Sequence, residues 1–346
     1  MSARRGFTSE SLAAGVRAGD TRALARAITL VENSDPLAYE LVRDVYPETG
    51  HAYAVGVTGP PGGGKSSLIS ALVRHVRAAR RSVGVITVDP SSPFTQGALL
   101  GDRIRLADHF LDPEVFIRSM GTRGHLGGLA EATLQALLLL DAAGKELVFL
   151  ETVGAGQSEV EVIGIADTVV LVLMPGSGDS IQALKAGIME IPDVIAINKL
   201  DHPAAKTMLS EVRSVLSLDK ERAWRPPIVL TEAVRGENIE ELWARIEEHR
   251  AHLETAGLLE ERRREHLAGE VFAVASARAK SYLEEAVADD PELRRVLAAV
   301  QGRELDPLTA VREIMEKVFR ISPDPSLEPG SGEKDDGDGN HRPDSR

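Results

Sequence analysis

The chain has 346 residues, of which 43% are apolar and 27% are charged, an ordinary globular composition. It has no cysteine, which excludes disulfides, thiolate metal sites, iron–sulfur clusters and a cysteine nucleophile. Its net charge of −13 argues against nucleic acid or an anionic membrane as the main partner. No apolar run approaches the roughly 18 residues of a membrane span, and the N-terminus MSARRGFTSE lacks a signal-peptide core. We therefore expect a cytoplasmic protein with no membrane and no nucleic-acid partner.

The central part of the chain, residues 51–255, alternates short apolar runs with helical stretches. The runs are apolar on both faces, as expected of buried parallel strands. The expected strands are Tyr53–Thr58, Val83–Val88, Val115–Arg118, Leu147–Glu151, Thr168–Met174, Asp193–Asn198 and Ile228–Thr231. This order predicts an α/β domain, in which a mostly parallel sheet is flanked by helices through right-handed crossovers.

Both ends of the chain are expected to extend this domain. Residues 1–50 carry apolar side chains three or four apart, and Asp20 is suited to cap a helix there, so we predict an N-terminal helical extension. Residues 256–320 return to a helical pattern whose apolar stripe must be buried somewhere, and we predict a dimerisation arm. Residues 321–346 are rich in Pro, Gly and Asp, which is typical of a disordered acidic tail.

The clearest motif follows the first expected strand, where GPPGGGKSS satisfies G-x-x-x-x-G-K-[ST] between a strand and a helix. Backbone N–H groups of such a loop surround phosphate oxygens, and the following helix adds the positive end of its dipole. Lys65 can reach the β- and γ-phosphates of a nucleotide, and the Ser66 hydroxyl can ligate Mg²⁺. The candidate phosphate-binding residues are Gly59, Gly62, Gly63, Gly64, Lys65, Ser66 and Ser67.

Acidic residues that can complete a Mg²⁺ site stand at or after the ends of expected strands. They are Asp89, Asp102 and Glu151. Loops at the carboxyl ends of parallel strands form the ligand crevice, and Mg²⁺ prefers oxygen ligands. We therefore predict Ser66 and these three acids as metal ligands. A structural cap is the alternative role for an acid that directly ends a strand.

The segment Glu151-Thr152-Val153-Gly154 is similar to the γ-phosphate-sensing segment of P-loop GTPases, and the N–H of Gly154 can contact the γ-phosphate. In Ras-like GTPases the next residue is a glutamine that orients the attacking water, but here it is Ala155. Gln157 is the nearby candidate, with shaping of the loop as its alternative role. The candidate catalytic residues are thus Lys65, Glu151 and Gln157, and we predict slow intrinsic hydrolysis unless a partner supplies a group.

A second motif, Asn198-Lys199-Leu200-Asp201, follows a later strand and fits N-K-x-D. Asp201 can accept from guanine N1–H and the exocyclic amine, two donors that adenine lacks there. Each such charge-assisted bond contributes roughly 1.5–3 kcal/mol, so two predict about a hundredfold preference for guanine. Lys199 can lay its stem along the base. The residues in the usual place of the S-A-x base loop are Thr231, Glu232 and Ala233.

Three longer runs give these motifs a family context. VDPSSPFTQGALLGDRIRL, FIRSMGTRGHLGGLA and ETVGAGQSEVEV closely resemble the methylmalonyl-CoA mutase-associated GTPases, the MeaB/ArgK group, and the resemblance spans about residues 10–320. It implies a homodimeric, Mg²⁺-dependent GTPase that converts GTP to GDP and phosphate. It also implies a chaperone of an adenosylcobalamin-dependent acyl-CoA mutase, acting in cofactor loading, protection or rescue. The residues that it places on phosphate, metal and base are Lys65, Ser66, Asp89, Asp102, Glu151, Asn198, Lys199 and Asp201.

Two other functions compete with this interpretation. A small-molecule P-loop kinase would need an acceptor pocket and a catalytic base. A metallochaperone GTPase that delivers nickel would need soft or imidazole ligands, but His51, His75, His109 and His125 are scattered along the sequence. The run GDSIQALK at 178–185 departs from the family's GDELQGIK, so the client mutase stays open among methylmalonyl-, isobutyryl-, hydroxyisobutyryl- and ethylmalonyl-CoA mutases.

Overall fold

The computed structural model describes residues 8–89, 106–121, 128–152, 164–176, 192–218 and 223–319. The chain divides into two compact units, Met1–Ala277 and Arg278–Arg346. The division falls within one long helix, α11. In the described part of the chain, no helix is both long and apolar enough to cross a membrane.

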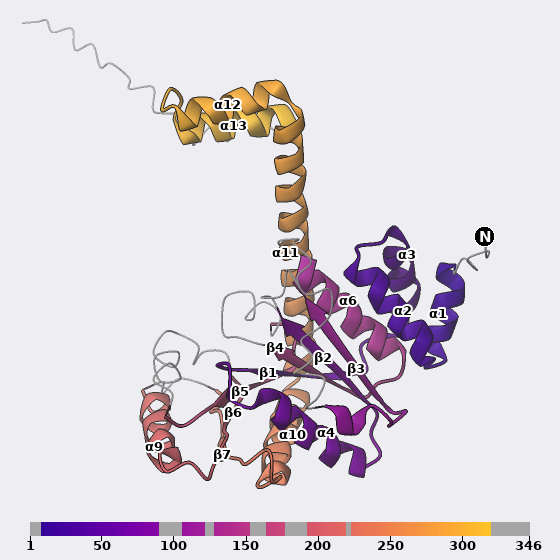
Figure 1. Ribbon diagram of the computed structural model, residues 1–346, viewed down its shortest axis with the longest axis vertical. Coiled ribbons are helices and arrows are strands. Elements are labelled where there is room, and N and C mark those ends of the chain that lie inside the picture. Colours follow the sequence, from indigo (N-terminus) through magenta and orange to yellow (C-terminus); the bar gives the residue numbers. More distant parts are fainter. Residues whose placement is uncertain are drawn as a thin grey trace, which may run out of the picture. The chain divides into compact units, whose positions relative to one another are not determined.

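The larger unit is built on a parallel sheet whose seven strands lie in the order β3-β2-β4-β1-β5-β6-β7 (Figure 1). The strands are β1 Tyr53–Thr58, β2 Val83–Asp89, β3 Val115–Gly121, β4 Leu147–Thr152, β5 Thr168–Leu173, β6 Val194–Ile197 and β7 Ile228–Leu230. Each of the seven sequence-predicted runs forms one of these strands, with ends that differ by a few residues at most. The predicted α/β class, a parallel sheet flanked by helices, is confirmed.

Helices cover both faces of the sheet (Figure 1). One face carries α1 Ser9–Arg17, α2 Thr21–Glu32, α3 Pro36–Val45 and α6 Gly128–Ala142, and the other carries α4 Lys65–Ala78 and α10 Ile239–Thr255. The remaining elements are η1 Tyr46–Glu48, η2 Ala107–His109, α9 Ala205–Leu216 and α11 Leu258–Asp289. In β4, Val148 and Leu150 join the first core whereas Leu147 and Phe149 join the second. Period-two alternation thus feeds two cores from one strand that is apolar throughout.

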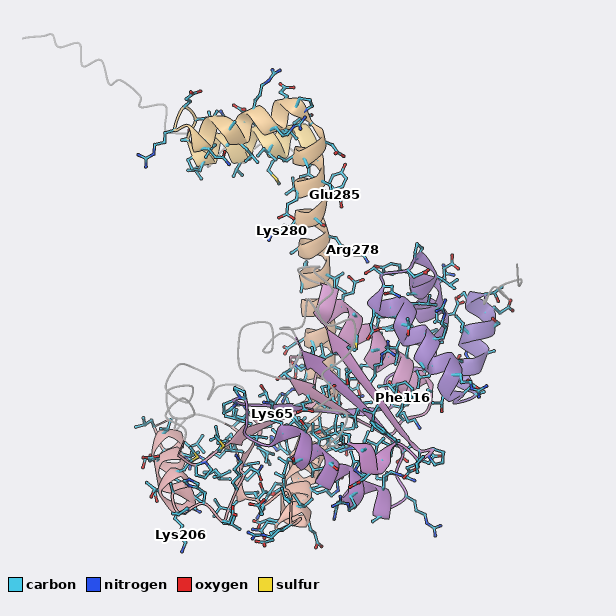
Figure 2. The ribbon with its side chains drawn as sticks, in the orientation of Figure 1. Lys65, Phe116, Lys206, Arg278, Lys280 and Glu285 are labelled. Carbon is cyan, nitrogen blue, oxygen red and sulfur yellow. The ribbon has the colours of Figure 1, made fainter. Side chains whose placement is uncertain are left out.

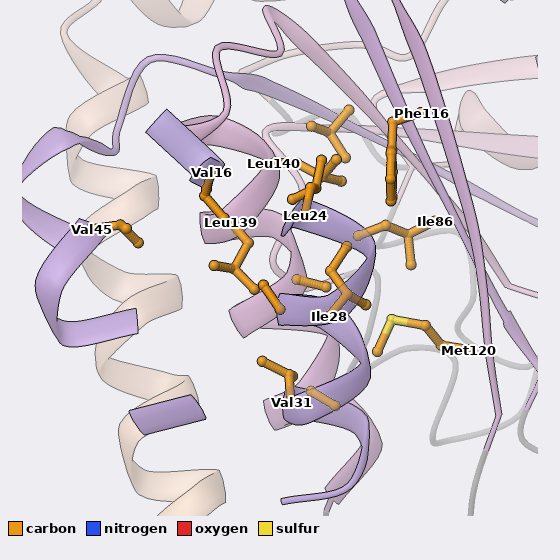
Figure 3. Close-up of a cluster of buried hydrophobic side chains, with 14 of the residues drawn as sticks. Val16, Leu24, Ile28, Val31, Val45, Ile86, Phe116, Met120, Leu139 and Leu140 are labelled. Atoms are coloured by element: carbon orange, nitrogen blue, oxygen red, sulfur yellow. The ribbon is translucent and has the colours of Figure 1, made fainter. Parts of the chain in front are cut away.

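The N-terminal helices are part of the main core. Asp20 caps α2 by accepting from the backbone N–H groups of Arg22 and Ala23 at 2.9 and 2.7 Å, as predicted. Leu24 and Ile28 of α2 are buried in the same cluster as side chains of α6 and the sheet (Figure 3). Over its described residues 8–50, the predicted N-terminal helical region therefore packs on one face of the α/β domain.

Partly buried ion pairs hold the start of α11 against the sheet. Arg262 makes two contacts to Asp193 at 3.2 and 2.9 Å, and Arg263 makes two to Asp167 at 2.7 and 2.8 Å. These two aspartates directly precede β6 and β5. His249 of α10 lies against Asp193, and burial lowers the pKa of its imidazole to about 4. The ring is therefore neutral at physiological pH.

The smaller unit contains two further helices, α12 Pro291–Gln301 and α13 Pro307–Phe319. Both begin at a proline, which suits the first position of a helix, and each is capped by the preceding aspartate. Leu308 and Val311 of α13 are 78% and 57% exposed. The smaller unit thus carries large apolar side chains that it does not bury itself.

Candidate functional site

The phosphate loop follows β1, and two of its glycines are required by geometry. Gly59 has φ +138°, and a Cβ there would collide with the carbonyl oxygen of Val172 in β5. Gly64 has φ +87°, and a Cβ there would collide with the side-chain nitrogen of Asn198. Any other residue would push the loop away from its neighbouring strands. The glycine-rich motif therefore allows the loop to curl tightly at the carboxyl edge of the sheet.

Helix α4 starts directly after this loop, and Figure 2 marks Lys65 at its first turn. The preceding Gly64 has no side chain to cap the helix, so the first N–H groups of α4 face the loop. The Lys65 ammonium donates to the carbonyl oxygens of Gly59 and Pro60 at 2.7 and 3.1 Å. An uncapped helix N-terminus and an ammonium at one loop form a strong anion site, which suits phosphate.

Oxygen groups suited to Mg²⁺ lie beside this loop. The Ser66 hydroxyl donates to Glu151 Oε1 at 2.6 Å, and the two residues are 2% and 3% exposed. A hydroxyl and a carboxylate are hard oxygen ligands, so these residues fit the predicted metal. Asp89 ends β2, whose pairing of Thr87 with Glu151 brings the backbone of Asp89 to the same sheet edge. In the described residues, no three His, Asp or Glu side chains gather as a complete metal cluster.

Several predicted site residues lie outside the described part of the chain. Asp102 falls in the gap at 90–105, and both Gly154 and Gln157 fall in the gap at 153–163. The side chain of Asp89 also lies outside the description. The metal-binding roles of Asp89 and Asp102 and the water-positioning role of Gln157 therefore stay predictions from the sequence.

Asn198 joins the phosphate loop to the base-reading loops. Its side-chain nitrogen donates to the carbonyl oxygen of Gly63 at 2.9 Å. Its side-chain oxygen accepts from the Ala233 N–H at 3.1 Å and from the Thr231 hydroxyl at 3.3 Å. Asn198 is only 2% exposed. It therefore acts as a buried bridge between residues that lie 135 positions apart along the chain, and the two motifs are parts of one site.

The last residues of N-K-x-D are more open. Lys199 has φ +62°, and its ammonium lies 2.8 Å from the sulfur of Met174. Asp201 keeps 58% of its side chain exposed, with a guanidinium nitrogen of Arg235 at 4.0 Å from its carboxylate. A carboxylate that is exposed at this position has room to accept from a base, the role that the sequence predicts for it.

Sequence reasoning placed Glu232 in the base loop but did not predict its contacts. Its carboxylate accepts a long hydrogen bond from the Val234 N–H at 3.4 Å, and the residue is 7% exposed. Burial, and next the neighbouring Asp201, raise the pKa of Glu232 above its usual value. Arg235 was missed as well. The available signal was that Thr-Glu-Ala departs from the Ser-Ala that is usual in this loop.

Comparison with known proteins places this site in a family context. The family model described as methylmalonyl Co-A mutase-associated GTPase MeaB matches residues 24–288. A Pyrococcus abyssi protein, whose name provisionally classes it as a GTPase, is 47% identical over 88% of this chain and 95% of its own. GTPase ArgK of Escherichia coli is 34% identical over 87% of this chain and 94% of its own.

Two further relatives extend the comparison. The Caenorhabditis elegans methylmalonic aciduria type A homolog is 34% identical over 75% of this chain and 70% of its own. A crystal structure titled LAO/AO transport system kinase superposes with a TM-score of 0.68 and 27% identity, over 92% of this chain and all of that one. With its parallel sheet, its phosphate loop and a family match over most of its length, the chain belongs to the MeaB family of methylmalonyl-CoA mutase-associated GTPases.

Proposed function

We propose that this chain is a Mg²⁺-dependent GTPase that converts GTP to GDP and phosphate. The observation that carries the proposal is the Asn198 bridge, because it joins a phosphate loop and a guanine-reading motif into one site. Lys65 binds the β- and γ-phosphates, Ser66 and Glu151 hold the metal, and Asp201 reads the base. Bound Mg²⁺ would neutralise part of the negative charge on the phosphates. Gly154 and Gln157 are proposed to contact the γ-phosphate and the attacking water.

Phosphate release tests this activity directly. Release should be faster from GTP than from ATP, and chelation of Mg²⁺ should abolish it. Equal rates for the two nucleotides would contradict guanine reading, and release that persists under chelation would contradict the metal site. Adding arginine should leave the products unchanged. A phosphorylated acceptor would instead indicate the kinase alternative, to which the name of the LAO/AO structure refers.

We further propose that the protein acts as a nucleotide-dependent chaperone of an adenosylcobalamin-dependent acyl-CoA mutase, in cofactor loading, protection or rescue. The family description and the name of the C. elegans relative support this role. The test is a pull-down of the full chain with purified methylmalonyl-, isobutyryl-, hydroxyisobutyryl- and ethylmalonyl-CoA mutases. One of them should bind with an affinity that differs between GDP and a non-hydrolysable GTP analogue. Binding to none of the four would contradict the mutase role.

The helical region at residues 256–320 is proposed to form the homodimer. The exposed Leu308 and Val311 support this, because a soluble chain rarely leaves two large apolar side chains side by side on one helix face. Light scattering on the full chain should show a dimer. Leu308→Lys with Val311→Lys should shift it to monomer, whereas Glu313→Lys, on the opposite side of α13, should not. A doubly substituted protein that stays dimeric at the same concentration would place the interface elsewhere.

A further inference from the structure

The loop that carries the base-reading motif runs along the end of β5. At the start of this loop, the Asn198 N–H donates to the carbonyl oxygen of Leu173, the last residue of β5, at 2.9 Å. Further along, the imidazole of His202 packs on Gly176, where a Cβ would lie 3.0 Å from the ring Cε1 and 3.3 Å from Nε2. The loop therefore contacts the end of β5 and the residues just after it at two places, and Asp201 lies directly before the second.

The imidazole of His202 is held in one orientation by the backbone around it. Its Nδ1 accepts from the Ala204 N–H at 3.2 Å. A ring nitrogen that accepts a hydrogen bond carries no proton, so this bond assigns the proton of the neutral ring to Nε2. The His202 N–H also donates to the Lys199 carbonyl oxygen at 2.9 Å, which closes a turn that includes Asp201. The ring is thus fixed at Nδ1 by the backbone, and its opposite edge meets Gly176.

Gly176 makes this close approach possible. Its φ of +79° lies in the left-handed region, which favours glycine, and it has no Cβ to push the ring away. A methyl group there would lie closer to the imidazole than ordinary van der Waals contact, so the ring and the loop behind it would have to shift. The packing of His202 on this glycine therefore sets how far the base-reading loop stands from the end of β5.

Asp201 is restrained by the backbone on both of its sides. On one side the Leu200 N–H donates to the carbonyl oxygen of Thr231 at 3.0 Å, and on the other lies the packed ring of His202. The Arg235 guanidinium, at 4.0 Å and 53% exposed, adds little because solvent screens such pairs. A carboxylate that accepts two hydrogen bonds from one base must keep a narrow range of orientations. The restraints on the neighbouring residues therefore bear on base reading.

We propose that His202 is a positioning residue for guanine recognition, whose imidazole packs on Gly176 and thereby holds the Asp201 carboxylate where it accepts from both N–H donors of the base. The proposal rests on the guanine-nucleotide function proposed above. The N-K-x-D motif ends at Asp201 and predicts no role for the residue that follows it, so this role comes from the contact across to Gly176. Without the ring, one of the two bonds to the base is misaligned and weakened, while the phosphates are bound as before.

The experiment measures the affinities of GDP and inosine diphosphate (IDP) for the wild type and His202→Asn. Hypoxanthine lacks the exocyclic amine, so it gives Asp201 one donor where guanine gives two. Asparagine can still accept from the Ala204 N–H but is too short to pack on Gly176. The ratio of GDP to IDP affinity should fall about three- to tenfold in His202→Asn, because one charge-assisted bond is weakened. A loop that is merely destabilised would lower both affinities together, and an unchanged ratio would overturn the proposal.

Gly176→Ala tests the same contact from the other side, and it does so even if His202→Asn does not fold. The added methyl group should displace the ring and lower the ratio in the wild-type background. In the His202→Asn background the ring is absent, so the ratio should change little further. Strain from the left-handed backbone is common to both backgrounds and cancels in the comparison. A ratio that Gly176→Ala leaves unchanged in the wild type, or changes equally in both backgrounds, would overturn the proposal.

The matched control is His51→Asn, which alters an exposed histidine just before β1, at the sheet edge opposite the phosphate loop. It should keep the wild-type ratio, and thermal unfolding checks that each variant is folded. These failures differ from failure of the proposed function, because in that case the wild type itself would not prefer GDP to ADP.

Discussion

The phosphate end and the base end of the candidate site are built in different ways. At the phosphate end, Lys65, Ser66 and Glu151 are 6%, 2% and 3% exposed and sit at the junctions of β1, α4 and β4. At the base end, Asp201 and Arg235 are 58% and 53% exposed on loops after β6 and β7. The first end takes its geometry from regular elements. The second depends on contacts between loops, which makes it the easier end to alter without unfolding the domain.

Of the substitutions considered, the one at the phosphate end should reduce nucleotide affinity the most. Lys65→Ala removes a cation that faces two phosphate groups, and each charge-assisted bond contributes roughly 1.5–3 kcal/mol. GTP affinity should therefore fall by about a hundredfold to ten-thousandfold. Fluorescence titration with a labelled guanine nucleotide measures the change, and Lys206→Ala, an exposed lysine on α9, is the matched control. Wild-type affinity in Lys65→Ala would remove the phosphate-site assignment.

At the base end, Asp201→Asn should change specificity more than fold. The amide can no longer accept from both guanine N–H groups but can donate to the O2 of xanthine. The preference for guanine over xanthine nucleotide should fall by roughly a hundredfold, because about two charge-assisted bonds are lost. Competition binding of GDP against xanthosine diphosphate measures it, with thermal unfolding to check that the fold is intact. An unaltered base preference would mean that another residue reads the base.

Asn198→Ala should affect both ends at once, because this side chain is the bridge between them. The substitution removes the hydrogen-bond partner of the buried Gly63 carbonyl and of the buried Ala233 N–H. Each buried polar group left unpaired costs about 1–3 kcal/mol of stability. We expect lower thermal stability and GDP and ADP affinities that fall together. A loss confined to guanine nucleotides would instead show that Asn198 acts on the base alone.

Features that depend on neighbouring residues could be predicted from the sequence, whereas contacts between distant loops could not. The strands, the phosphate loop and the role of Asp20 as a cap follow from local patterns, since short continuous apolar runs, glycine spacing and cap residues act over a few positions. The hydrogen bonds of Asn198 with Gly63 and Ala233 join positions on separate loops, and no local pattern encodes such contacts. The packing of α2 in the core could not be predicted from the sequence either. An amphipathic pattern shows that a helix has a buried face, but it does not show which surface covers that face.

The smallest change in nucleotide affinity is expected from a substitution at Thr231, in the base-reading loop. Thr231→Val keeps the shape of a fully buried side chain but removes the hydroxyl that donates to Asn198 at 3.3 Å. Asn198 would still accept from the Ala233 N–H and donate to Gly63, so the bridge should hold. A single neutral hydrogen bond contributes about 1 kcal/mol, which corresponds to roughly a fivefold loss of GDP affinity at most. Titration of both GDP and ADP separates the possibilities: a small loss for GDP fits a bridge held by its other two bonds, whereas a loss as large as that of Asn198→Ala would mean that Thr231 alone fixes the asparagine.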